Sequence, residues 1–208
     1  MGLRETKKQN TRREIADQAM RLFAQRGFDR VTVAEVADAA GVSEKTVFNY
    51  YPTKEDLFYD EVPEREAAIA GAIRGRASGE SVLAALRRLQ IGECNRLCSP
   101  QFATFARIIE DSPALRAKEL EVMARFVHAV ASALESELAI DARDARIAAG
   151  LLVSVHRQFF RAAREQALAG RSGPGAVRAL RDDLERAYRL LEHGLGDLGR
   201  PQSAAAEA

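Results

Sequence analysis

The sequence predicts an all-α protein, and both its residue composition and its hydrophobic periodicity support that fold class. Ala, Leu, Arg and Glu dominate the chain of 208 residues, and these residue types have high helix propensity. Apolar residues recur at intervals of three and four positions, whereas the alternating runs of Val, Ile and Thr that are typical of strands are few. This length suits one or two domains with a sizeable hydrophobic core.

Turn signals divide the first part of the chain into short helices. Residues 1–10 are polar and basic, and we expect a frayed arm there. A first helix then runs to about Arg26 and ends at Gly27, because glycine readily adopts the positive φ that closes a helix. A short second helix starts at Thr32, which together with Glu35 has the spacing of a capping box.

The residues Gly41, Val42 and Ser43 form a turn between the second helix and a third one over about residues 44–50. Gly41 permits a positive φ, Val42 can fill the angle between the helices, and Ser43 can cap the third helix. Pro52 then ends that helix, because proline disfavours the helical region in the residue before it. Two short helices joined in this way form a helix-turn-helix, whose second helix can enter a DNA major groove.

The side chains of this region have the chemistry of DNA recognition. Lys45 can donate to guanine acceptors, and Asn49 can form two hydrogen bonds with adenine. Tyr50 and Lys54 lie where they can reach phosphate oxygens. The candidate DNA-binding residues are Thr32, Ser43, Glu44, Lys45, Thr46, Asn49, Tyr50 and Lys54. The basic residues of the arm, which either follow the DNA backbone or form a solvated tail, are Arg4, Lys7, Lys8, Arg12 and Arg13.

The rest of the chain is predicted to form a larger helical domain. We expect a helix from Lys54 into the 70s, a Gly- and Ser-rich break at 71–79, and further helices as far as about residue 195. The expected organisation is an N-terminal three-helix helix-turn-helix DNA-binding domain with its basic arm (1–53), a helical effector-binding and dimerisation domain (54–196), and a disordered tail (197–208).

Two surfaces of the larger domain are predicted from its apolar residues. The last helix has an apolar seam and the helix before it is apolar nearly all round, which favours a four-helix dimer interface over a purely internal core. The dimer candidates are Ile147, Leu151, Val177, Leu180, Leu184, Ala187, Tyr188 and Leu191. Several aromatic residues with few polar groups favour a pocket for a small, mainly apolar ligand. The ligand candidates are Cys94, Phe102, Phe105, Ile109, Met123, Phe126, Val127, His128, Val155, His156, Phe159 and Phe160.

A pattern of spaced residues between positions 11 and 60 is more specific than a bare helix-turn-helix. It comprises Thr11, Arg12, Arg13, Glu14, Ile15, Ala19, Leu22, Phe23, Gly27, Phe28, Val31, Thr32, Val33, Val36, Ala37, Ala40, Gly41, Val42, Ser43, Thr46, Val47, Phe48, Asn49, Tyr50, Tyr51, Lys54, Glu55, Asp56 and Leu57. This pattern resembles the N-terminal signature of the TetR family of repressors, with Tyr51 in a packing position where that family usually has Phe. The resemblance implies a homodimer, a palindromic double-stranded DNA operator, and a C-terminal domain that binds a small molecule and then releases DNA.

Other function classes are less well supported by the sequence. We find no phosphate-binding loop, no nucleophile elbow and no metal-ligand motif, so we expect neither an enzyme nor a cofactor or metal. A net charge of +1 disfavours a non-specific DNA binder. There is no apolar run long enough to span a membrane, and the expected location is cytoplasmic with reduced Cys94 and Cys98. An activator of the same family remains an alternative to a repressor, and a redox role for the two cysteines stays open.

Overall fold

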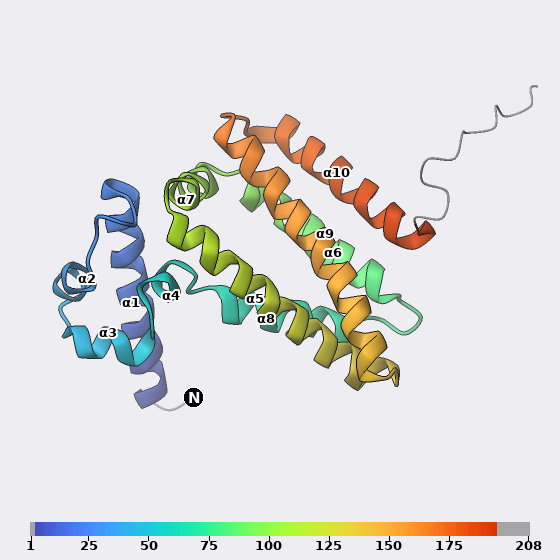
Figure 1. Ribbon diagram of the computed structural model, residues 1–208, viewed down its shortest axis with the longest axis horizontal. Helices are drawn as coiled ribbons and strands as arrows, with labels where there is room; N and C mark the ends of the chain where they lie inside the picture. Colours follow the sequence, from blue (N-terminus) through green and yellow to red (C-terminus); the bar gives the residue numbers. More distant parts are fainter. Residues whose placement is uncertain (1–2, 195–208) are drawn as a thin grey trace, which may run out of the picture.

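The computed structural model describes residues 3–194, and within this range the chain forms ten helices and no strand. Four helices make a small unit at one end of the molecule: α1 (Leu3–Arg26), α2 (Val33–Ala39), α3 (Glu44–Tyr50) and α4 (Lys54–Phe58). The larger unit contains α5 (Val62–Arg74), α6 (Val82–Leu97), α7 (Pro100–Asp111), α8 (Pro113–Leu138), α9 (Ala142–Leu168) and α10 (Gly173–His193). Figure 1 shows the two units side by side, with α7 and the start of α8 nearest to the first. The predicted all-α class is confirmed.

The short helices of the first unit are bounded by local caps. The predicted capping box at Thr32 and Glu35 is present. Ser43 caps α3, and a second capping box joins Thr53 to Asp56 at the start of α4. Gly41, in the turn between α2 and α3, has φ of +65°, a conformation that residues with a side chain rarely adopt. The helix-turn-helix is therefore specified by residues that lie within a few positions of one another.

Two expected boundaries near the N-terminus differ from the structure. Helix α1 begins at Leu3, so the segment expected to be a frayed arm is largely helical. The helix expected from Lys54 into the 70s is two helices, because α4 ends at Phe58 and α5 begins at Val62. Pro63 lies in the first turn of α5, where its missing N–H costs nothing. Inside one continuous helix it would remove a hydrogen bond and clash with the preceding turn.

The molecule has two hydrophobic cores, which meet around α4 and α7. Leu57 and Phe58 of α4 belong to the N-terminal core, so the change from one core to the other falls after Phe58 and not at the expected boundary of 53/54. Ile109 of α7 and Leu115 of α8 complete this same N-terminal core. The small unit therefore buries its apolar surface partly against the large one, and the two units are packed together.

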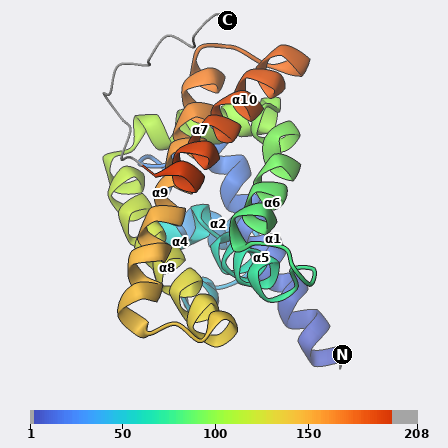
Figure 2. The same cartoon turned by 90° about the vertical axis from the view of Figure 1, so that its right-hand side faces the viewer.

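The second core lies among α5 to α10, where α8 packs on both α5 and α9, and α10 packs on α6 and α9 (Figures 1 and 2). Three residues expected at a dimer interface, Leu180, Leu184 and Tyr188, are fully buried in this single chain. That expectation is wrong for these three, because the seam of α10 turns inward onto α6 and α9. Ile147 and Leu151 on α9 are 59% and 54% exposed.

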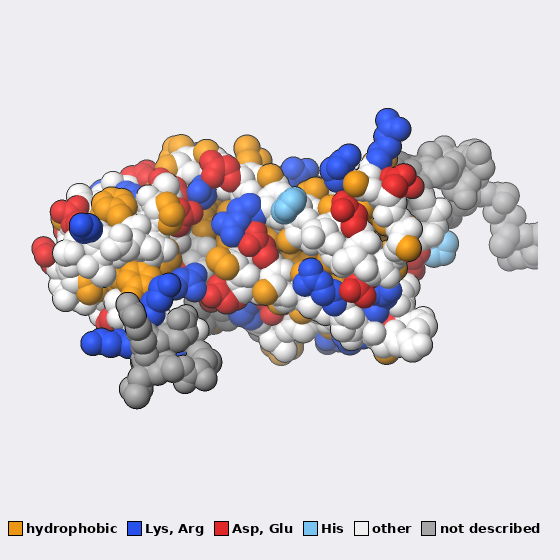
Figure 3. Space-filling model, turned by 90° about the horizontal axis from the view of Figure 1, so that it is seen from below, with side chains coloured by type: hydrophobic (Ala, Val, Ile, Leu, Met, Phe, Trp, Pro, Cys, Tyr) orange, Lys and Arg blue, Asp and Glu red, His pale blue; other side chains and the backbone are white. Residues whose placement is uncertain are grey.

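The ends of the chain lie outside the described residues, and with them the predicted tail at 197–208. Within residues 3–194, no helix combines the length and the apolar character needed to cross a membrane. In Figure 3, Lys and Arg side chains are interspersed with Asp and Glu side chains over the larger unit, with no patch of a single sign on that face. This mixture agrees with the net charge of +1.

Candidate DNA-binding surface and ligand cavity

Helix α3 turns one face to the N-terminal core and the other to solvent. Val47 on its inner face is buried, whereas Glu44, Lys45, Phe48 and Asn49 are exposed. The exposure predicted for Glu44, Lys45 and Asn49 is therefore found. Within the described part of the chain, the side chains of Lys45 and Asn49 have no hydrogen-bond or ion-pair partner, so their polar groups are free to bind a ligand from outside.

Phe48 is a residue of this surface that the sequence analysis missed. Its side chain is 48% exposed, which is unusual for a residue of this size and hydrophobicity. An apolar side chain on a helix that enters a major groove can pack against the methyl group of thymine. The signal was available in the sequence, because Phe48 follows the inward-facing Val47 by one position and therefore points about 100° away from it.

The three predicted contact residues Thr32, Ser43 and Thr46 have structural roles as well as exposed or half-exposed positions. Thr46 N–H donates to Ser43 Oγ at 3.1 Å, and the Thr46 hydroxyl oxygen lies 2.8 Å from the same atom. The backbone N–H and hydroxyl of Thr32 donate to Glu35 Oε2 at 2.8 and 3.0 Å. The backbone hydrogen bond from Thr32, followed by those from the side chains of Arg26 and Thr32, lowers the pKa of Glu35 to about 2.

Lys54 is held inside the first unit more firmly than the sequence suggested. Its Nζ donates to the carbonyl oxygens of Phe28 and Val31, each at 3.1 Å, and lies 4.2 Å from the centre of the Phe28 ring. The ammonium group thus fixes the start of α4 to the loop before α2, and one of its three N–H donors remains. Tyr50, at the end of α3, is half-buried.

The basic residues of the N-terminal segment separate into two groups. Lys7, Lys8 and Arg13 are exposed on α1. Arg12 instead turns toward the second unit, where Nη1 pairs with Glu64 at 2.7 Å and Nη2 donates to the carbonyl oxygen of Asp60 at 2.7 Å. The side chain of Arg4 lies outside the described residues. Arg12 is therefore a link between the two units and not part of a free basic arm.

Further polar contacts hold the first unit together and join it to the second. Tyr51 donates its hydroxyl hydrogen to the carbonyl oxygen of Arg12 at 3.0 Å, which ties the end of α3 to the same link. On the opposite side of α4, Lys118 of α8 pairs with Asp56 at 3.2 Å. Because Asp56 also forms the capping box of α4, this ion pair connects α8 to the start of that helix.

An aromatic stack connects the N-terminal core to the interior of the second unit. Phe58 of α4 stacks on Phe105 of α7, with ring centres 4.4 Å apart and planes at 15°. Phe105 in turn stacks on Phe102 at 5.9 Å, and Phe102 meets Phe160 of α9 at 6.4 Å. Through these four rings, the core beneath the helix-turn-helix is in continuous contact with the wall of a cavity.

That cavity, of about 300 Å³, lies among α4, α5, α7, α8 and α9. The predicted ligand residues that line it are Phe102, Phe105, Ile109, Met123, Phe126, His156 and Phe160. The predicted residues that do not line it are Cys94, Val127, His128, Val155 and Phe159. His128 is exposed on the outer face of α8, whereas Cys94, Val155 and Phe159 are buried in the second core. Helix phase explains these misses, because adjacent residues of one helix point in different directions.

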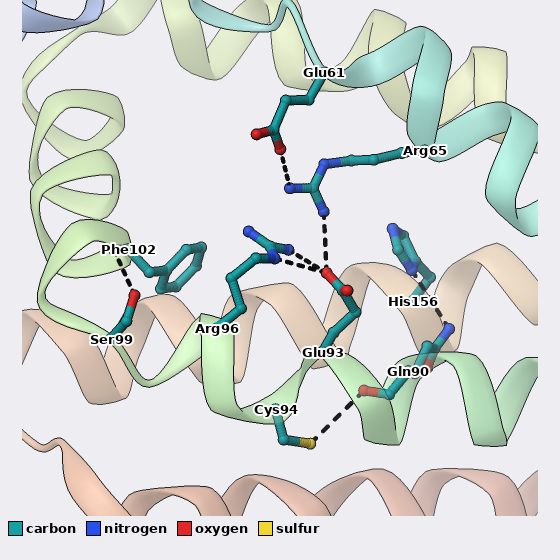
Figure 4. Close-up of polar contacts among 9 residues, drawn as sticks. All are labelled: Glu61, Arg65, Gln90, Glu93, Cys94, Arg96, Ser99, Phe102 and His156. Atoms are coloured by element: carbon teal, nitrogen blue, oxygen red, sulfur yellow. Dashed lines mark hydrogen bonds and ion pairs between the residues drawn. The ribbon is translucent and has the colours of Figure 1, made fainter.

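The charged side chains around the cavity were not among the predicted ligand residues. Arg65 of α5 pairs with Glu61 at 2.5 Å and with Glu93 of α6 at 3.5 Å. Arg96 shares the same Glu93 carboxylate, with Nε at 2.8 Å, as Figure 4 shows. These four residues form a network of two acids and two bases that joins α5 to α6 along one side of the cavity. Apolar periodicity gives no signal for such a network.

His156 places a polar ring among the aromatic residues of the cavity wall. It packs between Phe126 and Phe160, with ring centres at 5.1 and 4.8 Å, and its Nδ1 lies 3.4 Å from the Gln90 amide nitrogen. Burial, followed by the charge of Arg65, lowers the pKa of His156 to about 4. The imidazole is therefore neutral at pH 7. The Oε1 atom of Gln90 is buried without a hydrogen-bond partner.

Asp60, between α4 and α5, is one of the residues that line the cavity. Burial, followed by the nearby charge of Glu61, raises the pKa of Asp60 to about 6. Cys94 and Cys98 are both free thiols in buried positions, and burial raises the pKa of each. Among the described residues, no group of three or more His, Cys, Asp or Glu side chains has the arrangement needed to hold a metal ion.

Comparison with known proteins gives a match over the helix-turn-helix. Residues 15–60 match the family model described as bacterial regulatory proteins, tetR family. The regulator TcmR of Streptomyces glaucescens is 28% identical over 127 residues, which are 57% of this chain and 56% of that protein. MftR of Mycobacterium tuberculosis, named as a putative mycofactocin biosynthesis regulator, is 28% identical over 139 residues, which are 58% of this chain and 66% of that protein. The matches thus span about half to two thirds of these relatives.

Solved structures with the same fold cover nearly the whole chain. FadR of Thermus thermophilus, a TetR-family repressor, is 25% identical with a TM-score of 0.54 and covers 94% of this chain and 100% of that one. A putative TetR-family regulator of Mesorhizobium loti is 19% identical with a TM-score of 0.53 and covers 89% of this chain and 96% of that one. The N-terminal segment of this chain thus matches the tetR family of bacterial regulatory proteins, and the whole chain has the fold of the solved TetR-family regulators.

Proposed function

We propose that this protein is a ligand-responsive transcriptional regulator that binds a palindromic operator as a dimer and is released from it by a small, mainly apolar effector. The observation that carries this proposal is the free outer face of α3, where Lys45, Phe48 and Asn49 are exposed together. Groups that donate to guanine, pair with adenine and contact thymine methyl groups are what a recognition helix needs.

The proposed dimer forms through α9 and α10. Ile147 and Leu151 lie one turn apart on α9 and are more than half exposed, and Leu190 on α10 is 47% exposed. Large apolar side chains that share an exposed face favour burial against a second copy. A palindromic operator requires a two-fold axis in the protein, and α9 and α10 lie on the side of the molecule away from α3 (Figure 1).

The proposed effector site is the aromatic cavity, and coupling to DNA runs through α4. A ligand against Phe102 and Phe105 acts on Phe58 through the stack, and Arg12 and Lys118 transmit movements of α5 and α8 to α1 and α4. A ligand that favours another spacing of the two recognition helices lowers operator affinity by population shift. The T. thermophilus neighbour is described as a repressor in complex with lauroyl-CoA, which supports a repressor with an effector in this domain.

The test of this proposal is selection of genomic DNA fragments by the purified protein, followed by footprinting. We expect an enriched palindromic site that spans two successive major grooves. Lys45→Ala should weaken binding by about 1–3 kcal/mol for each half-site, and Tyr50→Phe should weaken it less. Arg74→Ala, an exposed change in the last turn of α5, is the matched control and should bind as the native chain does. If no fragment is enriched and Lys45→Ala has no effect, the proposal is wrong.

A further inference from the structure

Ser112 is the single residue that joins two helices of the cavity wall. Helix α7 ends at Asp111, and α8 begins at Pro113. Proline disfavours a helical conformation in the residue before it, and Ser112 is accordingly extended, with φ of −120° and ψ of 111°. When two rigid helices move relative to each other, the few residues between them absorb the change in backbone angles. Ser112 is therefore the hinge between α7 and α8.

Both helices of this hinge contribute side chains to the cavity. The lining residues are Phe102, Phe105 and Ile109 of α7, and Val122, Met123 and Phe126 of α8. The backbone N–H of Ser112 also donates to the carbonyl oxygen of Ile109 at 3.2 Å, so the hinge is bonded directly to a residue of the cavity wall. A ligand that changes the separation of these two walls turns α7 against α8 at Ser112.

The side chain of Ser112 is hydrogen-bonded to the DNA-binding unit. Ser112 is only 2% exposed, and its hydroxyl donates to Asp29 Oδ1 at 2.8 Å. The same hydroxyl oxygen accepts the backbone N–H of Leu115 at 3.4 Å and so caps α8. A hydrogen bond to a carboxylate is stronger than one between two neutral groups. The hinge residue therefore connects the first turn of α8 to Asp29.

Asp29 lies in a loop that meets the starts of both α2 and α4. This loop, residues 27–31, follows α1 and leads into Thr32, the N-cap of α2. Two carbonyl oxygens of the loop, those of Phe28 and Val31, accept hydrogen bonds from Lys54 at the start of α4. The Ser112 contact thus reaches the helix-turn-helix at its first helix, by a route separate from the aromatic stack.

Burial makes this contact harder to break than an ion pair at the surface. The pair between Arg12 and the exposed Glu64 also joins the two units, but water can replace either partner there. If the Ser112 hydroxyl lost Asp29, a buried donor would be left without an acceptor, which is costly. The loop at 27–31 should therefore follow Ser112 when the hinge turns.

We propose that the Ser112–Asp29 hydrogen bond transmits hinge movement between α7 and α8 to the helix-turn-helix, and that both residues position the recognition helix without contacting DNA. This inference deepens the regulation of the proposed function and rests on that function. With the bond intact, the DNA-binding unit keeps one orientation on the larger unit. Without it, the unit takes several orientations, of which only some match the operator.

The first experiment measures operator affinity by mobility shift, and Asp29→Ala is the test variant. It should lower affinity by about fivefold for each half-site, the factor that corresponds to one ordinary hydrogen bond. Charge alone predicts the opposite sign, because the change removes a negative charge from a unit that approaches phosphates. Asp38→Ala removes an equal charge from an exposed position on α2 and is the matched control, which should not lose affinity. Asp29→Asn keeps an acceptor for the hydroxyl and should retain native affinity.

Variants of the serine separate its contact with Asp29 from its role as a helix cap. Ser112→Ala should lower operator affinity as Asp29→Ala does, and the double variant should be no weaker than Ser112→Ala alone, because both changes remove the same bond. Ser81→Ala removes the cap of α6 without touching the DNA-binding unit and should leave operator affinity unchanged. Circular dichroism checks that all variants fold.

The second experiment needs no DNA. Nitroxide labels on Glu44→Cys of α3 and Ser132→Cys of α8, both exposed positions, report the distance between the two units by pulsed electron paramagnetic resonance, with unlabelled chain added in excess. We expect one narrow distance distribution in the otherwise native chain and a broader one with Asp29→Ala or Ser112→Ala.

An unchanged distance distribution in Asp29→Ala overturns the inference, and so does an operator affinity of Asp29→Ala equal to or above that of the native chain. A chain that binds no operator contradicts the regulator function, and the distance measurement still decides whether Ser112 and Asp29 orient the DNA-binding unit.

Discussion

The recognition helix and the ligand cavity belong to one chain but depend on contacts of very different range. Helix α3 is bounded by Ser43, which caps it from within three residues, and it is oriented by the turn at Gly41. The cavity draws its lining from Met20 in α1 to Arg164 in α9, and its polar network joins residues 28 positions apart. A substitution in α3 should therefore change the contacts of that residue alone. A substitution in the cavity wall should change the packing of several helices together.

Two phenylalanines ten positions apart make this contrast concrete. Phe48 on α3 is 48% exposed, and Phe58 on α4 is 2% exposed and stacks on Phe105. The first has a ring available to a partner outside the chain. The second joins the core of the DNA-binding unit to the cavity. The same residue type thus serves recognition in one place and packing in the other.

The largest expected effect comes from exchanging these two rings for alanine. Phe58→Ala should lower the free energy of unfolding by about 3–5 kcal/mol, because it removes a buried ring and leaves a cavity between the two units. Phe48→Ala should change stability by less than about 0.5 kcal/mol and lower operator affinity instead. Chemical denaturation and a DNA titration on both variants check this. Equal losses of stability would contradict the separation of roles.

A smaller effect is expected from the pH dependence of stability. The pKa of His156 is lowered to about 4 in the folded chain from an ordinary value near 6.5, so the unfolded chain binds more protons between these values. The contribution of His156 to the free energy of unfolding is therefore fully present above pH 6.5. It is lost as the pH falls toward 4, and the loss is about 3 kcal/mol at most. Asp60 acts in the opposite direction, because its raised pKa favours the folded state at low pH and that contribution is lost as the pH rises through about 6.

The variant His156→Gln isolates the histidine contribution, because it keeps a polar group beside Gln90 and cannot take up a proton. Denaturation measured from pH 4 to pH 7 should be less pH-dependent in this variant than in the native chain. His128→Gln, at an exposed position on α8, is the control and should leave the native dependence intact. An unchanged slope in His156→Gln would mean that the imidazole is not held neutral by burial.

The smallest expected effect tests the locally determined region. Thr53→Ala removes the capping box of α4 and should cost about 1 kcal/mol, which corresponds to about 2–4 °C in Tm for a chain of this size. Thr53→Ser keeps the hydroxyl acceptor and should retain most of the stability. Thermal unfolding compares the two. A loss as large as that of Phe58→Ala would show that the start of α4 depends on more than its own cap.

Sequence patterns were most reliable where one residue acts on its near neighbours. Spacing within a single turn or helix predicts four such features. They are the caps at Thr32 and Ser43, the positive φ at Gly41 and the exposure of Lys45. The patterns were less reliable at Pro63, which divides the expected long helix after Lys54. A proline at this position indicates the start of a new helix. Apolar residues at helical spacing on both sides of Pro63 favoured one continuous helix instead, so the break between α4 and α5 was not predicted.

The all-α class, the helix-turn-helix and its outward polar face could be predicted from residue order, because hydrogen bonds between close residues and helix periodicity produce these features. The inward direction of Leu180, Leu184 and Tyr188, and the bridge that Arg12 makes between the two units, depend on how distant helices pack. That packing alone brings Asp60 to the wall of an aromatic cavity. An amphipathic pattern states that a helix face is apolar, and it does not say which partner covers that face. Ion pairs between distant residues produce no periodic pattern in the sequence, because each depends on how two separate helices pack against one another.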